Sequence, residues 1–126
     1  MRDASCRLAR YYAEVDKGDF EAAEAMLHPR VQFAVHLPGG ARRGDTSEGL
    51  IGYLTGRGEV VRRHAPLRMS SDGDLEFMYG AVIEDETRCT GHFLASVRID
   101  PDGLIAAYHV SFDTELTLVT DDKVEQ

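Results

Sequence analysis

Residues 10–20, RYYAEVDKGDF, combine two adjacent tyrosines with an aspartate, Asp16. Tyrosine and aspartate are weak helix formers, so a helix that only has to pack has little reason to carry them together. Two interpretations are open. Either Asp16 accepts hydrogen bonds at a helix end, or its carboxylate lies in a pocket and takes part in proton transfer, where tyrosine hydroxyls would hold a ligand oxygen.

A first helix is predicted from an apolar stripe at helical spacing, formed by Leu8, Tyr11, Tyr12 and Val15. At about 100° per residue, Asp16 falls about 80° from Leu8, on the margin of this stripe. Gly18 ends the helix, and Asp19 caps a second helix over residues 20–28 by accepting its free amide hydrogens. Asp16 is therefore expected at the edge of the buried side of the first helix.

The rest of the chain is predicted to be mostly strand. Residues 31–37 form a strand, residues 38–45 a loop, and a third helix begins at Thr46 or Ser47. Apolar and polar residues then alternate with period two over residues 59–70, 75–83, 88–99 and 104–118, which predicts long antiparallel strands. In the strand 75–83 the odd-numbered residues are expected on the apolar face, and in the strand 104–118 the even-numbered ones.

Helices that gather on one face of a curved sheet make a cone. The predicted fold class is therefore α+β, with a curved antiparallel sheet and helices packed on its concave face. A chain of 126 residues suffices for one core, so we expect a single domain over residues 1–126, with a core at 5–118 and a flexible tail at 119–126.

Composition and charge restrict the classes of partner that the protein can bind. The net charge of −8 argues against a nucleic acid or an anionic membrane, since both need clustered positive charge. The arginines in the middle of the chain are surrounded by Asp and Glu and predict a solvated face: Arg42, Arg43, Arg57, Arg62, Arg63 and Arg68. The two cysteines, Cys6 and Cys89, do not have the spacing of metal ligands, and the histidines do not either. No metal and no cofactor are therefore expected. Reduced thiols, together with the lack of a signal-like or membrane-spanning run, predict a cytoplasmic protein.

The order of the elements, together with YYAEVDKGDF, GLIGYL and DGLIAAYHVSFD, resembles the nuclear-transport-factor-2-like superfamily, in particular its SnoaL-like members. The resemblance covers about residues 5 to 118. It implies the cone fold, a cavity between sheet and helices, and a homodimer packed through the outer face of the sheet. The superfamily holds isomerases, dehydratases, cyclases, epoxide hydrolases and non-catalytic binders, so it leaves the function open.

Two catalytic patterns of this superfamily are incomplete in the chain. Ketosteroid isomerases use a tyrosine on the first helix, and Tyr11 matches it, but their base aspartate and second oxyanion acid correspond to Val35 and Ala95. SnoaL-type polyketide cyclases carry a histidine and an aspartate on the last strand, and Tyr108 and Val110 occupy those positions.

The third pattern is that of scytalone dehydratase and hexachlorocyclohexane dehydrochlorinase, and here Asp16 and His64 match its aspartate and histidine. In such a pair the imidazole abstracts a proton next to a carbonyl or a leaving group, while the carboxylate fixes the tautomer and stabilises the imidazolium. On a regular strand His64 would face away from Leu67 and Met69. The pair therefore depends on an irregularity, such as a bulge at Pro66.

We therefore expect a cofactor-independent SnoaL-like enzyme of isomerase, cyclase or dehydratase type that abstracts a proton from a small apolar cyclic or polyketide-like substrate. Its catalytic residues would be Asp16, His64 and Tyr11. The alternative is a non-catalytic module on the same fold that binds a small hydrophobic molecule. Strand parity and the third helix predict the other residues of the cavity wall: Tyr53, Tyr79, Tyr108, Phe33, Val35, Phe77, Ala95, Val110 and Phe112. Met78, Val82 and Leu94 would lie on the opposite face, where they predict the homodimer interface.

Overall fold

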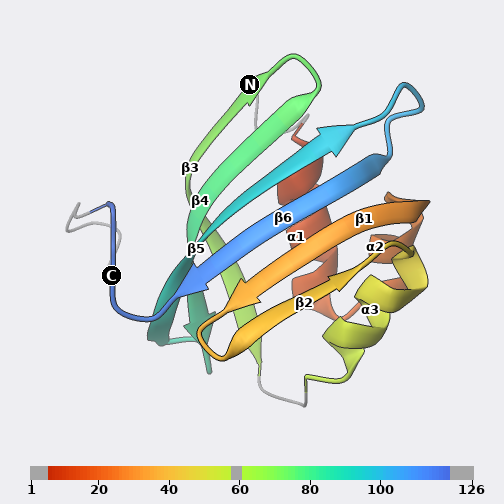
Figure 1. Cartoon of the computed structure of the whole chain (residues 1–126). Coiled ribbons are helices and arrows are strands. Elements are labelled where there is room, and N and C mark those ends of the chain that lie inside the picture. Colours follow the sequence, from red (N-terminus) through yellow and green to blue (C-terminus); the bar gives the residue numbers. More distant parts are fainter. Residues whose placement is uncertain (1–5, 58–60, 120–126) are drawn as a thin grey trace.

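Three helices and six strands make up the part of the chain that the computed structural model describes, residues 6–57 and 61–119 (Figure 1). The helices are α1 (Arg7–Lys17), α2 (Phe20–Ala25) and α3 (Ser47–Thr55). The strands are β1 (Leu27–Leu37), β2 (Gly40–Gly44), β3 (Arg62–Asp72), β4 (Leu75–Glu84), β5 (Arg88–Ile99) and β6 (Ile105–Asp113). The predicted tail lies outside these residues, except for Val119.

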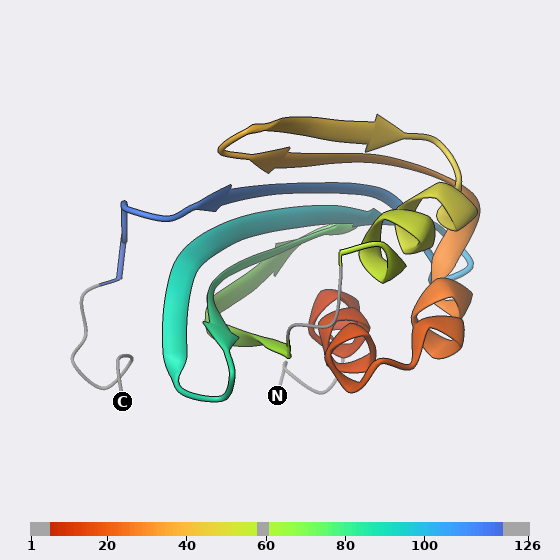
Figure 2. The same ribbon diagram turned by 90° about the horizontal axis from the view of Figure 1, so that it is seen from below.

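All the strands belong to one sheet, in the order β2-β1-β6-β5-β4-β3. The sheet curves around α1, and all three helices lie on its concave side (Figure 2). The predicted α+β cone is thereby confirmed. Two details were wrong: β1 runs parallel to β6, so the sheet is mixed, and the expected loop at 38–45 contains β2, which forms a hairpin with β1.

The helix termini follow from local chemistry. Gly18 ends α1 in the left-handed conformation with φ 78°, and Asp19 caps α2 by accepting from the amide of Ala22, as the sequence predicts. The second helix ends earlier than expected, at Ala25. The start of α1 has no side-chain cap of its own. Instead, the Glu76 carboxylate of β4 accepts from the amide of Leu8 at 2.9 Å and ties the helix to the sheet.

The predicted face of β4 was wrong by one residue. Met78 and Val82 are buried in the core, whereas Phe77 and Tyr79 lie on the outer face. The alternation of apolar and polar residues predicted the wrong face because the residues of β4 that face the core include three that are not apolar: Glu76, Gly80 and Glu84. Each has a local purpose: Glu76 holds α1, Gly80 leaves room for the Phe93 ring, and Glu84 pairs with Arg62 at 3.3 Å.

The end of the predicted last strand was also wrong. The strand stops at Asp113, and Leu116 and Leu118 beyond it are 61% and 64% exposed. Near the start of β6 the register with β5 shifts between the pairs Arg98–Ala107 and Ile99–Ile105. Ile105 therefore points toward the core and is fully buried. The residues of β6 that follow, Tyr108 and Val110, face the core as expected.

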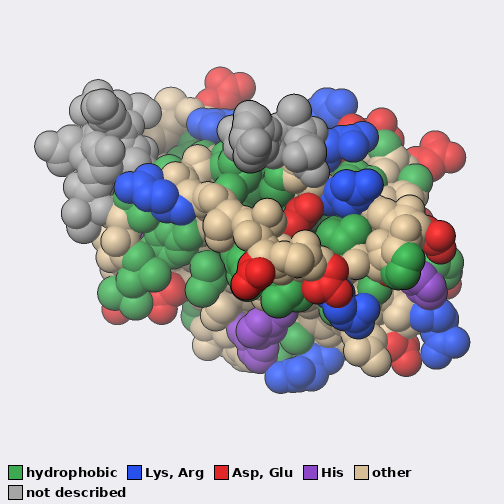
Figure 3. All heavy atoms as spheres, turned by 90° about the horizontal axis from the view of Figure 1, so that it is seen from above, with side chains coloured by type: hydrophobic (Ala, Val, Ile, Leu, Met, Phe, Trp, Pro, Cys, Tyr) green, Lys and Arg blue, Asp and Glu red, His purple; other side chains and the backbone are tan. Residues whose placement is uncertain are grey.

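The set of residues from which the homodimer interface was predicted needs correction as well. Met78 and Val82 are buried inside the protomer, and of the three residues predicted there only Leu94, 51% exposed, is accessible. The homodimer itself stays a prediction. On the face drawn in Figure 3, the described Lys and Arg side chains are interspersed with Asp and Glu, with hydrophobic side chains between them.

Candidate active site

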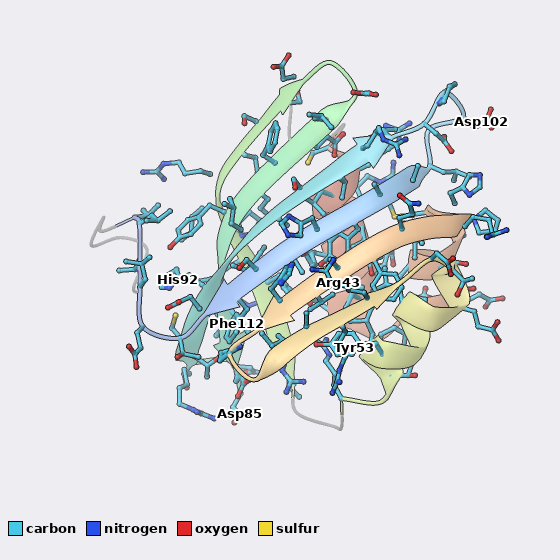
Figure 4. The ribbon with its side chains drawn as sticks, viewed as in Figure 1. Arg43, Tyr53, Asp85, His92, Asp102 and Phe112 are labelled. Carbon is cyan, nitrogen blue, oxygen red and sulfur yellow. The ribbon has the colours of Figure 1, made fainter. Side chains whose placement is uncertain are left out.

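A cavity of about 360 Å³ lies between α1, α3 and the concave face of the sheet. The residues of its wall include Leu37 at the end of β1, Arg62 at the start of β3, Glu84 at the end of β4 and Phe112 near the end of β6. Figure 4 shows Tyr53 and Phe112 toward the end of the sheet that carries Asp85, opposite the turn with Asp102. The wall is thus built at one end of the cone.

Asp16 and His64 are joined by two hydrogen bonds. The Asp16 Oδ1 atom lies 2.7 Å from Nδ1 of the His64 ring, and its Oδ2 atom accepts from the backbone N–H of His64 at 2.7 Å. The two side chains are only 16% and 10% exposed. A carboxylate accepts, so the neutral ring carries its proton on Nδ1 and its lone pair on Nε2. Since His64 belongs to the cavity wall, Nε2 is the ring nitrogen left for a ligand.

The expected irregularity in β3 is what allows this contact. Pro66 pairs with Gly80, and the next pair is Arg68 with Tyr79, so Leu67 has no partner on β4. On the near side of this bulge His64 pairs with the inward-facing Val82, and on the far side Met69 pairs with the inward-facing Met78. The extra residue changes the parity of the strand and places an even-numbered and an odd-numbered residue on one face.

Two aromatic rings hold the imidazole in place. The Tyr12 ring stacks on His64 with centroids 4.3 Å apart and planes 17° from parallel, and the Phe93 ring meets it edge-on at 5.3 Å. Phe93 also packs against Tyr12 at 5.2 Å. Since Asp16 fixes one edge of the ring and these neighbours fix its faces, the imidazole is pre-positioned before any ligand enters.

Tyrosine hydroxyls provide hydrogen-bond donors on the same wall. The hydroxyls of Tyr12 and Tyr108 are hydrogen-bonded to each other at 2.5 Å, and the buried Tyr11 hydroxyl has no partner among the described residues. Burial raises the pKa of all three phenols well above the usual value. The phenols therefore stay protonated near neutral pH. The Tyr12–Tyr108 bond uses one of its two hydroxyl protons and leaves the other free to donate.

The structure brings together most of the residues that the sequence predicts for the site. His64, Tyr11, Tyr53, Tyr108, Val35, Val110 and Phe112 line the cavity. Asp16 does not line it; it lies behind His64, to which it is bonded.

Four predicted wall residues lie elsewhere. Phe33 is buried against Gly44 and Gly49, and Ala95 is fully buried without reaching the cavity. Phe77 and Tyr79 point outward because the phase of β4 differs from the prediction by one residue. The Tyr79 ring stacks on the outer-face residue His92 at 5.7 Å, and its hydroxyl accepts from the amide of Leu118.

Several wall residues were not predicted: Tyr12, Phe93, Arg57, Arg62 and Glu84. The helical stripe and the parity of β5 placed Tyr12 and Phe93 in the core, so these two could have been assigned to the wall. Arg57 and Arg62 were assigned to a solvated face with four other arginines. Those four are exposed, but Arg57 and Arg62 are half-buried and line the cavity.

Comparisons with known proteins connect this geometry to a fold. No protein-family model matches the chain, and no curated protein matches it significantly. Solved structures do. A candidate SnoaL-like polyketide cyclase from Shewanella putrefaciens has a TM-score of 0.72 at 12% identity over 90% of this chain and 91% of that one. This chain has the nuclear-transport-factor-2-like fold.

Further structures with this fold carry different descriptions. A nuclear-transport-factor-2-like protein of unknown function from Cytophaga hutchinsonii has a TM-score of 0.66 at 18% identity over 85% and 87% of the two chains. An LEH-like epoxide hydrolase of M. tuberculosis has a TM-score of 0.67 at 19% identity over 85% and 80%. At such identities the likeness establishes the fold, and the function has to be argued from the site. Within the described residues, no helix is both long and apolar enough to cross a membrane.

Proposed function

We propose that this protein is a cofactor-independent enzyme in which His64 removes a proton from a small, largely apolar cyclic or polyketide-like substrate. The observation that carries the proposal is the hydrogen-bonded pair of Asp16 and His64 on the wall of an otherwise mostly apolar cavity. A pair with only a structural role does not require a ring nitrogen at the wall of a cavity large enough for a ligand.

The proton transfer follows from the arrangement. Nε2 of His64 takes the proton of a C–H bond next to a carbonyl, and the electron pair of that bond moves into the carbonyl to form an enolate. The Asp16 carboxylate, bonded to Nδ1, stabilises the resulting imidazolium. The hydroxyls of Tyr11 and of the Tyr12–Tyr108 pair donate to the enolate oxygen without giving up their protons.

The fate of the enolate distinguishes the reaction types. Return of the proton from the His64 imidazolium to another carbon gives isomerisation. Expulsion of a hydroxyl group on the next carbon, which takes that proton and leaves as water, gives dehydration. Attack of the enolate carbon on a second carbonyl, whose oxygen takes that proton, gives cyclisation. All three begin with the same proton removal. A test of that first step is therefore valid whichever reaction follows.

A binding module without catalysis is the second candidate, and one observation favours it. Asp16 also accepts from the backbone N–H of His64, so it ties α1 to β3 whether or not the ring does chemistry. In this alternative the tyrosines and the imidazole would fix the orientation of a bound ligand.

Solvent deuterium incorporation separates the two functions. A panel of small cyclic ketones and β-hydroxy ketones is incubated with the protein in D₂O, and mass spectrometry follows uptake at the carbon next to the carbonyl. We expect uptake faster than in buffer. It should fall by about 10²- to 10⁴-fold in Asp16→Asn and in His64→Ala, and hardly further in the double variant.

The matched control is His92→Ala, which removes an imidazole from the outer face of the sheet and should leave uptake unchanged. Each variant is checked for native unfolding behaviour in urea. Uptake that persists in His64→Ala, or a panel that exchanges no faster than in buffer, would favour the binding module.

A further inference from the structure

We propose that Arg57 is an anion-recognition residue and that the ligand of the cavity carries a carboxylate. The inference takes the cavity of the proposed function as the binding site and narrows its substrate class from a neutral apolar molecule to a small cyclic or polyketide-like acid. It concerns the binding of the ligand and gives the Tyr11 hydroxyl to the carboxylate, so that with an acid substrate the Tyr12–Tyr108 pair alone donates to the enolate oxygen.

Arg57 is placed in the wall by the end of α3. Its backbone N–H donates to the carbonyl of Leu54 just past the helix, and its side chain lines the cavity. The guanidinium lies 5.8 Å from the centre of the Tyr53 ring. Its Nε atom is buried and has no hydrogen-bond partner among the described residues. A ring at this distance attracts the cation but accepts no N–H hydrogen bond from it.

The other charges of the wall cancel, and that of Arg57 does not. Arg62 pairs with Glu84 at 3.3 Å, and Glu84 also lies 3.5 Å from Arg88. Within the described chain, Arg57 forms no ion pair with a carboxylate. Among the side chains that line the wall, the charge of Arg57 is therefore left over, while the Asp16 carboxylate behind the wall is already bonded to His64.

The charge of Arg57 acts on the tyrosine hydroxyls. It lowers the pKa of Tyr11, Tyr12 and Tyr108, against the larger opposite effect of burial. The guanidinium and the three hydroxyls thus belong to one electrostatic neighbourhood. Arg57 Nε and the Tyr11 hydroxyl are both buried there, and neither has a partner in the part of the chain that the structure describes.

Two buried donors without acceptors, one of them charged, are costly unless something else supplies the acceptor. A carboxylate fits best. It accepts two N–H bonds from a guanidinium in parallel and has lone pairs left for a phenol. A cavity of about 360 Å³ is near the lower end of the usual range for ligand sites, about 300 to 1,000 Å³, and suits an acid with one or two rings.

The test compares acids with amides of the same shape. Binding of benzoate, cyclohexanecarboxylate and 2-naphthoate, and of the three corresponding carboxamides, is measured by titration calorimetry or NMR. We expect the wild-type protein to bind at least one acid about 10- to 100-fold more tightly than its amide. Arg57→Gln should abolish this preference, and Arg57→Lys should keep only part of it, because a lysine lacks the planar fork.

Arg63→Gln is the matched control, since it removes the same charge from an exposed position close in sequence and should keep the full preference. Urea unfolding verifies that Arg57→Gln is folded, and Arg57→Lys retains a charged variant should Gln be unstable. The inference is overturned if no acid binds the wild-type protein, if acid and amide bind equally, or if Arg57→Gln keeps the preference.

The same titrations in Asp16→Asn keep the two proposals apart. A carboxylate preference that persists there, together with absent deuterium uptake by the wild-type protein from cyclic ketones with and without a carboxylate, would support the anion site and reject the enzyme. Deuterium uptake without a carboxylate preference would do the reverse.

Discussion

Gly80→Ala should disturb both the stability of the protein and its candidate site. Gly80 lies on the inner face of β4, opposite Pro66 of β3 and Phe93 of β5. A Cβ atom there would come within 2.7 Å of the Ala65 carbonyl oxygen and 2.7 Å of the Phe93 ring. The carbonyl belongs to the strand backbone and cannot move alone. The ring is 2% exposed and packs edge-on against His64, so any shift of the ring disturbs that contact.

The magnitude follows from these two contacts. Adding a methyl group to a filled core typically costs about 1 to 3 kcal/mol. Replacing glycine by alanine recovers about 0.5 to 1 kcal/mol by reducing the freedom of the unfolded chain. Because one contact is with a rigid backbone carbonyl, we expect a cost at the upper end, about 2 to 3 kcal/mol, and so a net destabilisation of about 1 to 2.5 kcal/mol. We also expect a shifted environment for the His64 ring because Phe93 must move.

Urea unfolding measures the first effect, and the histidine ring resonances in NMR spectra the second. Gly52→Ala is the matched control. It adds the same methyl group to an exposed position in α3 where nothing lies within 4 Å, and it should stabilise the protein by about 0.5 to 1 kcal/mol. Gly80→Ala with the stability of the wild-type protein and unchanged His64 signals would refute the packing described for this part of the core.

Further predictions concern polar groups that are buried or half-buried. Glu76→Ala should lower the free energy of unfolding by about 1 to 3 kcal/mol in urea, because the Leu8 amide in the first turn of α1 loses its acceptor. Tyr108→Phe should cost a similar amount, since it leaves the buried hydroxyl of Tyr12 without its partner. Burial raises the pKa of the Cys6 thiol, so iodoacetamide at about pH 8.5 should alkylate the exposed Cys89 first. The raised pKa also means that the folded state favours the thiol, so the contribution of Cys6 to stability should be lost as the pH rises through that pKa, which unfolding curves at increasing pH will check.

Local rules predicted the helical part of the fold well. The apolar stripe of α1 is buried, Gly18 and Asp19 end and begin their helices as expected, and Thr46 caps α3 by accepting from the amide of Gly49. These features depend on residues within one or two turns of each other, so a single sequence contains the necessary information.

Local rules could not predict in the same way which face of a strand points toward the core. Alternation shows that β4 has two faces, but the inner face is chosen by partners distant in sequence: α1 for Glu76, Phe93 for Gly80 and Arg62 for Glu84. A pattern of apolar residues cannot reveal that a carboxylate will cap a helix from across the sheet.

The candidate site likewise contains a contact that the sequence predicted and a residue position that it did not. The Asp16–His64 contact was expected from a resemblance and depended on the bulge near Pro66, which the proline itself suggested. The inward position of Arg57 had no comparable signal, because in sequence it is one of several arginines among acidic residues. Only the fold separates it from the exposed ones.

The central claim is that Asp16 holds His64 with a free Nε2 toward the cavity, and ¹⁵N NMR of the imidazole tests it most directly. In the neutral form of the ring, the ¹⁵N shifts report which nitrogen carries the proton. His64→Gln assigns the signals by removing them. The account predicts a proton on Nδ1, directed at the carboxylate 2.7 Å away, and an unprotonated Nε2. A proton found on Nε2 would contradict it, because the cavity would then face a donor instead of a base.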